Sequence, residues 1–407
     1  MDPAGQGEQG RGRPVAAAER EAAGDFSFVR GGPAYRLLER AGLVEWRRGG
    51  IAGAAVVGAV VTWLPLLLLA ALGGRATDGV AIPFLRDAVA HIRFLVVVPL
   101  LFVADAVVGP ALASVARRFL AAGLVAPRDT DRFRDAAGLA AQRLDSAIAE
   151  AVLLAAAWIG SWIAFSKGRG VGIAAWDVLP SGSGGGLTAA GWWYVAVSVP
   201  VFQFLVYRWL WRGAVWTGFL ERVARLDLQL VASHPDRAGG LGFIATGEQS
   251  FAIVVFAVAA VGSARFAQQI LYAGAHVADF KMVLGGFVAI ATVVVFAPLA
   301  VFAPRLTALR RESHGEYSRL AGGHHRAFEA RWLRRDDVGS ELLGSPDVSS
   351  LADLDTAFQN VTALRTFPVD RRNVAVVAVA AALPIVPLVM LEIPVAEILR
   401  RILGILA

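Results

Sequence analysis

The sequence predicts an all-α protein, a polytopic bundle of about seven membrane-spanning helices with helical extensions on its cytoplasmic side. Of its 407 residues, 56% are hydrophobic and the mean hydropathy is +0.57, which is more apolar material than a soluble domain needs. Seven apolar runs with few charges each reach about 20 residues, the length of a helix that crosses the ~30 Å hydrocarbon layer. Arginines gather in alternate connections between these runs, as is typical of loops that stay in the cytoplasm.

The chain divides into four parts. Residues 1–32 are rich in glycine, proline and charge and lack a signal peptide, so we expect a disordered cytoplasmic tail. Residues 33–303 hold six spans with their loops, 304–372 form a cytoplasmic helical segment, and 373–407 hold the seventh span and an outer interfacial helix. The expected spans are Ile51 to Leu72, Phe94 to Val115, Ala147 to Phe165, Trp192 to Leu210, Phe251 to Tyr272, Val283 to Phe302, and Asn373 to Leu391.

The arginines also predict the orientation and the membrane. They crowd the segment before the first span and every second connection after it, which places the N-terminus inside and the C-terminus outside. Among 39 basic residues the only lysines are Lys167 and Lys281, and alanine is abundant, a bias typical of a GC-rich bacterial genome. We therefore expect a multi-pass protein of the bacterial inner (cytoplasmic) membrane.

Residue supply excludes several kinds of active site. The chain has no cysteine, so disulfides, thiolate nucleophiles and iron–sulfur clusters are ruled out. His314, His324 and His325 lack metal-ligand spacing, and no phosphate-binding loop, GxSxG elbow or kinase signature occurs. We expect no catalytic residue, no metal and no cofactor, and we attribute the basic pI of 10.2 to cytoplasmic loops rather than to nucleic-acid binding.

We single out three ionisable residues inside the predicted spans, where a charge costs about 2.5–3.5 kcal/mol at mid-membrane. Asp105 lies near the centre of the second span, and Arg265 lies past the centre of the fifth, toward the outside. Their depths differ by about 6 Å at the helical rise, which an arginine side chain can bridge. Three interpretations stay open: a buried structural ion pair, a proton or ion path in which Asp105 titrates, or no contact between them.

Other polar residues extend the hypothesis of an intramembrane polar path. Gln203 in the fourth span and Gln268 beside Arg265 fit either hydrogen bonds between helices or a water-filled vestibule. Glu150, near the cytoplasmic end of the third span, either joins the path or reaches the cytoplasmic surface. The candidate path residues are Asp105, Arg265, Gln268, Gln203 and Glu150.

The segment HPDRAGGLGF at residues 234–243 stands out between two hydrophobic blocks. Proline, aspartate and glycines favour a turn that leads from one helix into the fifth span. A second interpretation is a nest of backbone N–H groups that binds an anion such as a lipid phosphate. A His–Asp catalytic dyad finds no accompanying nucleophile. The candidate residues of this anion-binding turn are His234, Asp236, Arg237, Gly239, Gly240 and Gly242.

The cytoplasmic segment predicts helices that pack on one another. We expect the helix after the sixth span to break at Gly322 and Gly323, and we expect a further helix near Ser350, which is spaced with Asp353 as a capping box. Together with HPDRAGGLGF, the stretch SLADLDTAFQNVTALRTFPVDRRN resembles motifs of uncharacterised bacterial polytopic membrane proteins. This resemblance covers about the C-terminal half and implies a family without an assigned activity.

The favoured functional hypothesis is a channel or transporter-like bundle with a polar intramembrane path. The alternative is a non-enzymatic membrane scaffold or sensor that acts through its cytoplasmic helices, and a membrane enzyme ranks third. The expected partners are the lipid bilayer, anionic lipid headgroups, and either a second copy of the chain or a cytoplasmic protein.

Overall fold

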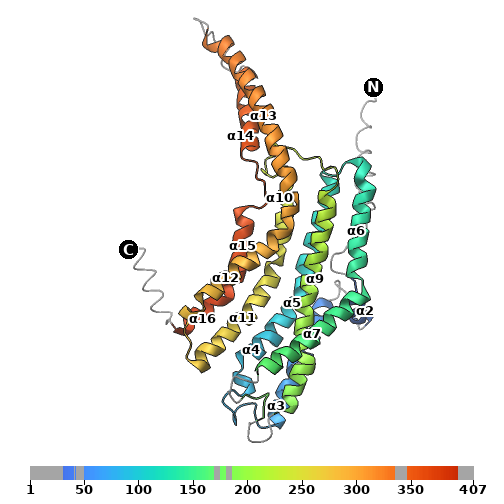
Figure 1. The fold of residues 1–407 in the computed structure, drawn as a ribbon, viewed down its shortest axis with the longest axis vertical. Helices are drawn as coiled ribbons and strands as arrows, with labels where there is room; N and C mark the ends of the chain where they lie inside the picture. The colour runs from blue at the N-terminus through green and yellow to red at the C-terminus, as the bar shows by residue number, and fades with distance from the viewer. Residues whose placement is uncertain are drawn as a thin grey trace, which may run out of the picture.

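The computed structural model describes residues 31–40, 42, 50–168, 175–179, 186–334 and 346–392. Within these ranges the chain forms helices joined by turns, and the β-structure consists of isolated bridges only. The predicted N-terminal tail, apart from its last two residues, and the predicted outer interfacial helix lie outside the described residues. Figure 1 shows a bundle of long helices that lie roughly along one axis.

Seven helical segments among the described residues are long and apolar enough to cross a membrane, which confirms the predicted all-α polytopic bundle. Each predicted span lies within one of them, and several helices continue well beyond the span. These segments are Gly50–Leu72, Ala88–Ala121, Ala147–Ser166, Ala189–Ala224, Gly242–Ala273, Val277–Leu333 and Arg371–Leu391.

Several of the seven segments join two or more helical pieces. The first and third are single helices, α3 (Gly50–Leu72) and α7 (Ala147–Gly168). The second segment comprises α4 (Ala88–His91), the π turn η3 (Ile92–Val97) and α5 (Val98–Ala121). The fourth segment comprises α8 (Ala189–Trp193), the π turn η6 (Tyr194–Ser198) and α9 (Val199–Ala224). The fifth comprises α10 (Gly242–Glu248), the 3₁₀ turn η7 (Gln249–Phe251) and α11 (Ala252–Ala273).

The remaining helices complete the chain. The sixth segment comprises α12 (Val277–Phe296), η8 (Ala297–Phe302), α13 (Ala303–Phe328) and η9 (Glu329–Leu333). The seventh comprises α15 (Arg371–Ala382), η11 (Leu383–Ile385) and α16 (Val386–Glu392). The connecting elements are α2 (Pro33–Arg40), η2 (Phe84–Arg86), η4 (Pro127–Asp129), α6 (Thr130–Leu144) and α14 (Pro346–Thr362).

A proline follows each of these two π turns. Pro99 and Pro200 follow η3 and η6 and lack the N–H group that an α-helix would donate four residues back. The residue before each proline closes its turn with an i→i+5 bond: the N–H of Val98 donates to the Arg93 carbonyl, and the N–H of Val199 donates to the Tyr194 carbonyl. The polar residue next to the start of η3 is Arg93, and η6 begins at Tyr194.

The helices pack in neighbouring pairs. α3 lies against α5, α7 against α9, and both α11 and α12 against α15. Aromatic side chains such as Phe119, Trp216 and Phe302 are fully buried between them. Large apolar side chains on the outer faces are exposed, for example Trp158 and Val293 at 60% and 67%, as expected for helix surfaces that meet lipid.

One end of the bundle carries most of the arginine-rich connections. We call it the arginine-rich end, and it is formed by α6, α10, α13 and α14. The hairpin of α13 and α14 projects beyond the other helices there (Figure 1). Two expectations for this hairpin are wrong. α13 continues through Gly322 and Gly323, because its packing against α14 outweighs the ~1 kcal/mol cost of each helical glycine. α14 begins at Pro346, so Ser350 is not its N-cap.

Candidate functional site

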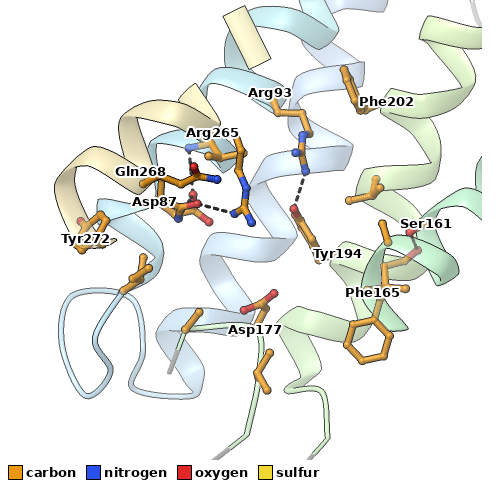
Figure 2. A pocket seen from close by; sticks show the side chains of 18 of the residues that line it. Asp87, Arg93, Ser161, Phe165, Asp177, Tyr194, Phe202, Arg265, Gln268 and Tyr272 are labelled. Atoms are coloured by element: carbon orange, nitrogen blue, oxygen red, sulfur yellow. Dashed lines mark hydrogen bonds between the residues drawn. The ribbon is translucent and has the colours of Figure 1, made fainter. Parts of the chain in front are cut away.

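A cavity of about 640 Å³ lies between the second, third, fourth and fifth spans, in the half of the bundle away from the arginine-rich end. α4 and η3 form one wall, η6 and the start of α9 another, and α7 and α11 complete it. Figure 2 shows polar side chains from these elements that point toward its interior. The polar and charged residues that line it are Asp87, Arg93, Ser161, Asp177, Tyr194, Gln203, Arg265, Gln268 and Gln269.

The two π turns place Arg93 and Tyr194 at the cavity. Nη1 of Arg93 donates to the Tyr194 hydroxyl at 2.6 Å, so η3 and η6 are joined through these side chains. The Arg93 guanidinium lies 5.4 Å from the ring centroid of Phe202 and 5.9 Å from that of Phe94. Such cation–π contacts hold the guanidinium in a mainly apolar setting. Its Nε atom is buried and forms no hydrogen bond.

Arg265 of α11 faces the same cavity from another wall (Figure 2). Its Nη1 donates to Oε1 of Gln268 at 3.0 Å, and Nε2 of Gln268 lies 3.5 Å from Oδ1 of Asp87. A glutamine thus stands between the arginine and the nearest carboxylate. Gln203 also lines the cavity, and its Oε1 atom is buried without a hydrogen-bond partner.

Asp87 has a structural role at the edge of the cavity. Its carboxylate caps α4 by accepting from the N–H groups of Val89 and Ala90 at 3.0 and 3.2 Å. It also accepts from Nε1 of Trp176 at 2.9 Å. These donors, with Gln268, stabilise its negative charge without a direct ion pair.

Asp177 is the second acid of the cavity and lies in the connection between the third and fourth spans. Burial raises its pKa to about 6, and the nearby negative charge of Asp87 adds to this effect. Among the described residues it forms no ion pair, and Figure 2 shows its side chain below Arg265 and Tyr194. Near neutral pH this carboxyl group can therefore gain or lose a proton.

The structure separates the predicted path residues into two groups. Gln203, Arg265 and Gln268 meet in the cavity, whereas Asp105 and Glu150 lie closer to the arginine-rich end. Asp105 does not contact Arg265. It pairs with Arg212 of α9, whose second nitrogen, Nη2, lies 3.3 Å from Oδ2 of Asp105.

Glu150 forms the neighbouring ion pair. Nε of Arg208 lies 3.5 Å from its Oε1, with both side chains about nine-tenths buried. Arg208 and Arg212 are one helical turn apart on α9, so the two ion pairs are adjacent along one helix. We call Asp105, Glu150, Arg208 and Arg212 the ion cluster.

The start of the described chain covers the ion cluster. The N–H of Ala34 donates to Oε2 of Glu150 at 2.7 Å, and Nη2 of Arg208 donates to the Gly31 carbonyl at 3.1 Å. Gly32 lies so close that a Cβ atom there would approach Oε1 of Glu150 to 2.2 Å. This segment closes the ion cluster toward the arginine-rich end.

Sequence reasoning missed Arg208 and Arg212 because their positions also fit cytoplasmic arginines placed by the orientation rule. The usable signal is their i, i+4 spacing, which continues to Trp216 and puts polar groups on one face of α9. Trp216 donates its Nε1 proton to Glu248, a buried acid of α10, at 2.6 Å. The polar face of α9 therefore continues past the ion cluster.

The HPDRAGGLGF segment forms the predicted turn before α10. The Asp236 carboxylate accepts from the N–H groups of Ala238, Gly240 and Gly242 at 2.8, 3.1 and 2.9 Å. Burial alone would raise the pKa of Asp236, but these bonds and His234 outweigh burial and hold the pKa below its usual value. An external anion would compete with Asp236 for these amides.

Backbone geometry explains the glycines of this turn. Arg237, Gly239 and Gly240 have φ angles of 52°, 67° and 95°, in the left-handed region that favours glycine. The turn is also a junction, because Nη2 of Arg365 donates to the Asp236 carbonyl at 2.7 Å and thereby ties in the link from α14 to α15. No group of three or more metal-ligating side chains forms within the described part of the chain.

Comparison of the chain with protein family models, curated proteins and solved structures finds no match. Functional conclusions therefore rest on the cavity and the ion cluster themselves.

Proposed function

We propose that this integral membrane protein is a transporter of the bacterial cytoplasmic membrane, and that its solute binds in the cavity. The observation that carries the proposal is the cavity of about 640 Å³ with charged and amide side chains inside an otherwise apolar bundle. Polar groups at membrane depth are costly and typically mark pathways for ions or solutes. This volume is in the range of small-molecule sites.

A transporter also needs a gate that closes its binding site toward one side of the membrane, and in this proposal the ion cluster is that gate. Along α9, Arg208 and Arg212 follow the cavity residue Gln203 in the direction of the arginine-rich end. Their paired, largely buried side chains would block passage from the cavity to that end. Two packings that alternately close the cluster and the cavity mouth would expose the solute to one side at a time. In this proposal the polar path contains Asp105 and Glu150 as members of the gate.

The absence of cysteine makes the proposal testable by single-cysteine labelling. We expect Gln269→Cys and Ala164→Cys, both in the cavity wall, to react with a membrane-impermeant maleimide added to proteoliposomes from the side opposite the arginine-rich end. We expect Glu150→Gln, which weakens the ion cluster, to raise labelling from the arginine-rich side.

The control is Val293→Cys, whose lipid-facing position should stay unlabelled from both sides. The transporter proposal fails if the cavity cysteines are unreactive from both sides, or if they react equally from both sides while the ion cluster is intact.

The α13–α14 hairpin supports the alternative of a membrane scaffold or sensor. It extends beyond the bundle (Figure 1), and it exposes Leu320 at 60%, while η9, which continues α13, exposes Leu333 at 71%. Exposed apolar side chains on a projecting element suit a protein partner. A scaffold role predicts that Leu320→Glu abolishes partner binding by the purified protein while cavity labelling is unchanged.

A further inference from the structure

Arg93 and Arg265 share one property that sets them apart from the arginines of the ion cluster. Both line the cavity, and neither forms an ion pair with a carboxylate within the part of the chain that the structure describes. Their hydrogen bonds go to neutral groups, the Tyr194 hydroxyl and the Gln268 amide. Arg93 is partly buried and Arg265 is exposed at the cavity, and guanidinium groups without carboxylate partners favour the binding of an anion.

The two acids of the cavity, Asp87 and Asp177, do not cancel its preference for an anion at low pH. The Asp87 carboxylate already accepts from backbone N–H groups and from Trp176. Asp177, in contrast, is neutral below a pH of about 6 because burial raises its pKa. The cavity then carries two guanidinium groups against one hydrogen-bonded carboxylate.

Aromatic side chains form another part of the wall. Phe165 lines the side formed by α7, Phe202 the side formed by α9, and Tyr272 the side formed by α11. Figure 2 shows Phe202 on the side of Arg93 and Phe165 on the side of Ser161. A ligand that fills this space must present apolar surface as well as charge.

We infer that the cavity binds an amphiphilic organic anion, with its carboxylate, sulfonate or phosphate group between Arg93 and Arg265 and its apolar part against Phe165 and Phe202. The inference rests on the proposed function, in which the cavity is the solute site. Two planar guanidinium groups offer enough donors to bind all oxygens of such a headgroup.

Asp177 makes this binding depend on pH. Asp87, at the N-cap of α4, and Tyr194 of η6 interact electrostatically with Asp177, whereas Arg93 and Arg265 share the cavity with it and Arg75 donates to the carbonyl of the neighbouring Val178. When Asp177 is ionised it repels an incoming anion, so affinity rises as the pH falls through about 6. The solvent-screened negative charge of Asp177 inside the same cavity is expected to change the affinity for the anion by roughly fivefold. Asp177→Asn should bind as tightly at pH 7.5 as the unmodified protein does at pH 5, with no pH dependence.

The test is equilibrium binding of decanesulfonate, whose charge is constant between pH 5 and pH 8, to the protein in nanodiscs of zwitterionic lipid. We expect Arg93→Gln and Arg265→Gln each to weaken binding at least tenfold, and Arg93→Lys and Arg265→Lys to retain part of it. Arg86→Gln, an exposed arginine at the same end, is the matched control and should have no effect. Decyltrimethylammonium, the cation of the same chain length, should not compete.

The inference would be overturned if both glutamine variants bound decanesulfonate as tightly as the unmodified protein does. It would also be overturned if decyltrimethylammonium bound more tightly than decanesulfonate. Because cavity labelling of Gln269→Cys needs no ligand, a failure of anion binding is distinguishable from a failure of the transporter proposal. An affinity that does not change between pH 7.5 and pH 5 would contradict the role of Asp177.

Discussion

Replacing Asp105 with alanine is expected to destabilise the protein by about 3 kcal/mol, because it leaves the Arg212 guanidinium without its carboxylate at a site where that arginine side chain is 5% exposed. An unpaired buried charge loses its hydration without compensation. The measurement is the free energy of unfolding in detergent micelles, or the matching fall in thermal midpoint.

The matched control removes both charges. Asp105→Ala combined with Arg212→Met keeps apolar volume beside Trp209, over whose ring the guanidinium lies at 4.6 Å. We expect the double variant to recover most of the lost stability, since no buried charge remains unpaired. A single variant as stable as the unmodified protein would show that the pair is hydrated rather than buried.

Asp236→Ala is expected to lower the free energy of unfolding by about 2–3 kcal/mol, since the N–H groups of Ala238, Gly240 and Gly242 lose their acceptor. The turn also anchors the α14–α15 link through Arg365, so faster proteolysis of the hairpin should accompany the loss. Thermal unfolding and limited proteolysis measure the two effects.

The pH dependence provides the check on this second prediction. The pKa of Asp236 is lowered in the folded protein, so its contribution is complete above its ordinary value of 3.8 and is lost as the pH falls through the lowered pKa. The stability difference between the unmodified protein and Asp236→Ala should stay constant from pH 8 to pH 5 and shrink only in stronger acid. A difference that disappears already at pH 6 would contradict the assignment of this stability to the Asp236 carboxylate.

The spans were predictable because the signal is local: each needs about 20 apolar residues, and a contiguous run shows this directly. The turn at Asp236 was predictable for the same reason, since its glycines and proline act on neighbouring backbone. The sequence could not show that the N–H groups of Ala238, Gly240 and Gly242 converge on the Asp236 carboxylate.

The cavity could not be predicted in full because its wall combines residues from four spans and from the connections beside them. The partner of Asp105 was missed for a specific reason. Arg212 lies beyond the apolar run of the fourth span, but α9 continues there. The side chain of Arg212 extends back toward the N-terminus of α9, as helical side chains do, and so reaches Asp105. The depth of each residue within its predicted span therefore favoured Arg265 as the partner of Asp105, although Arg265 lies in the cavity.

Arg93 and Tyr194 lie at the outer ends of the predicted spans, where a charge and an aromatic ring also fit the membrane interface, and only Pro99 and Pro200 gave an indirect signal of the π turns. A regular α-helical wheel through these spans misplaces every residue beyond the turn by the angle of one residue, about 100°.

The two π turns have an evolutionary consequence. A turn closed by an i→i+5 bond contains one residue more than the α turn that it replaces. Deleting one codon within either turn would restore a regular helix, leave the packing of α5 or α9 in place and remove Arg93 or Tyr194 from the cavity. Under the proposed function, we therefore expect single-residue deletions at these two positions to alter solute binding in the cavity more than they alter the stability of the bundle.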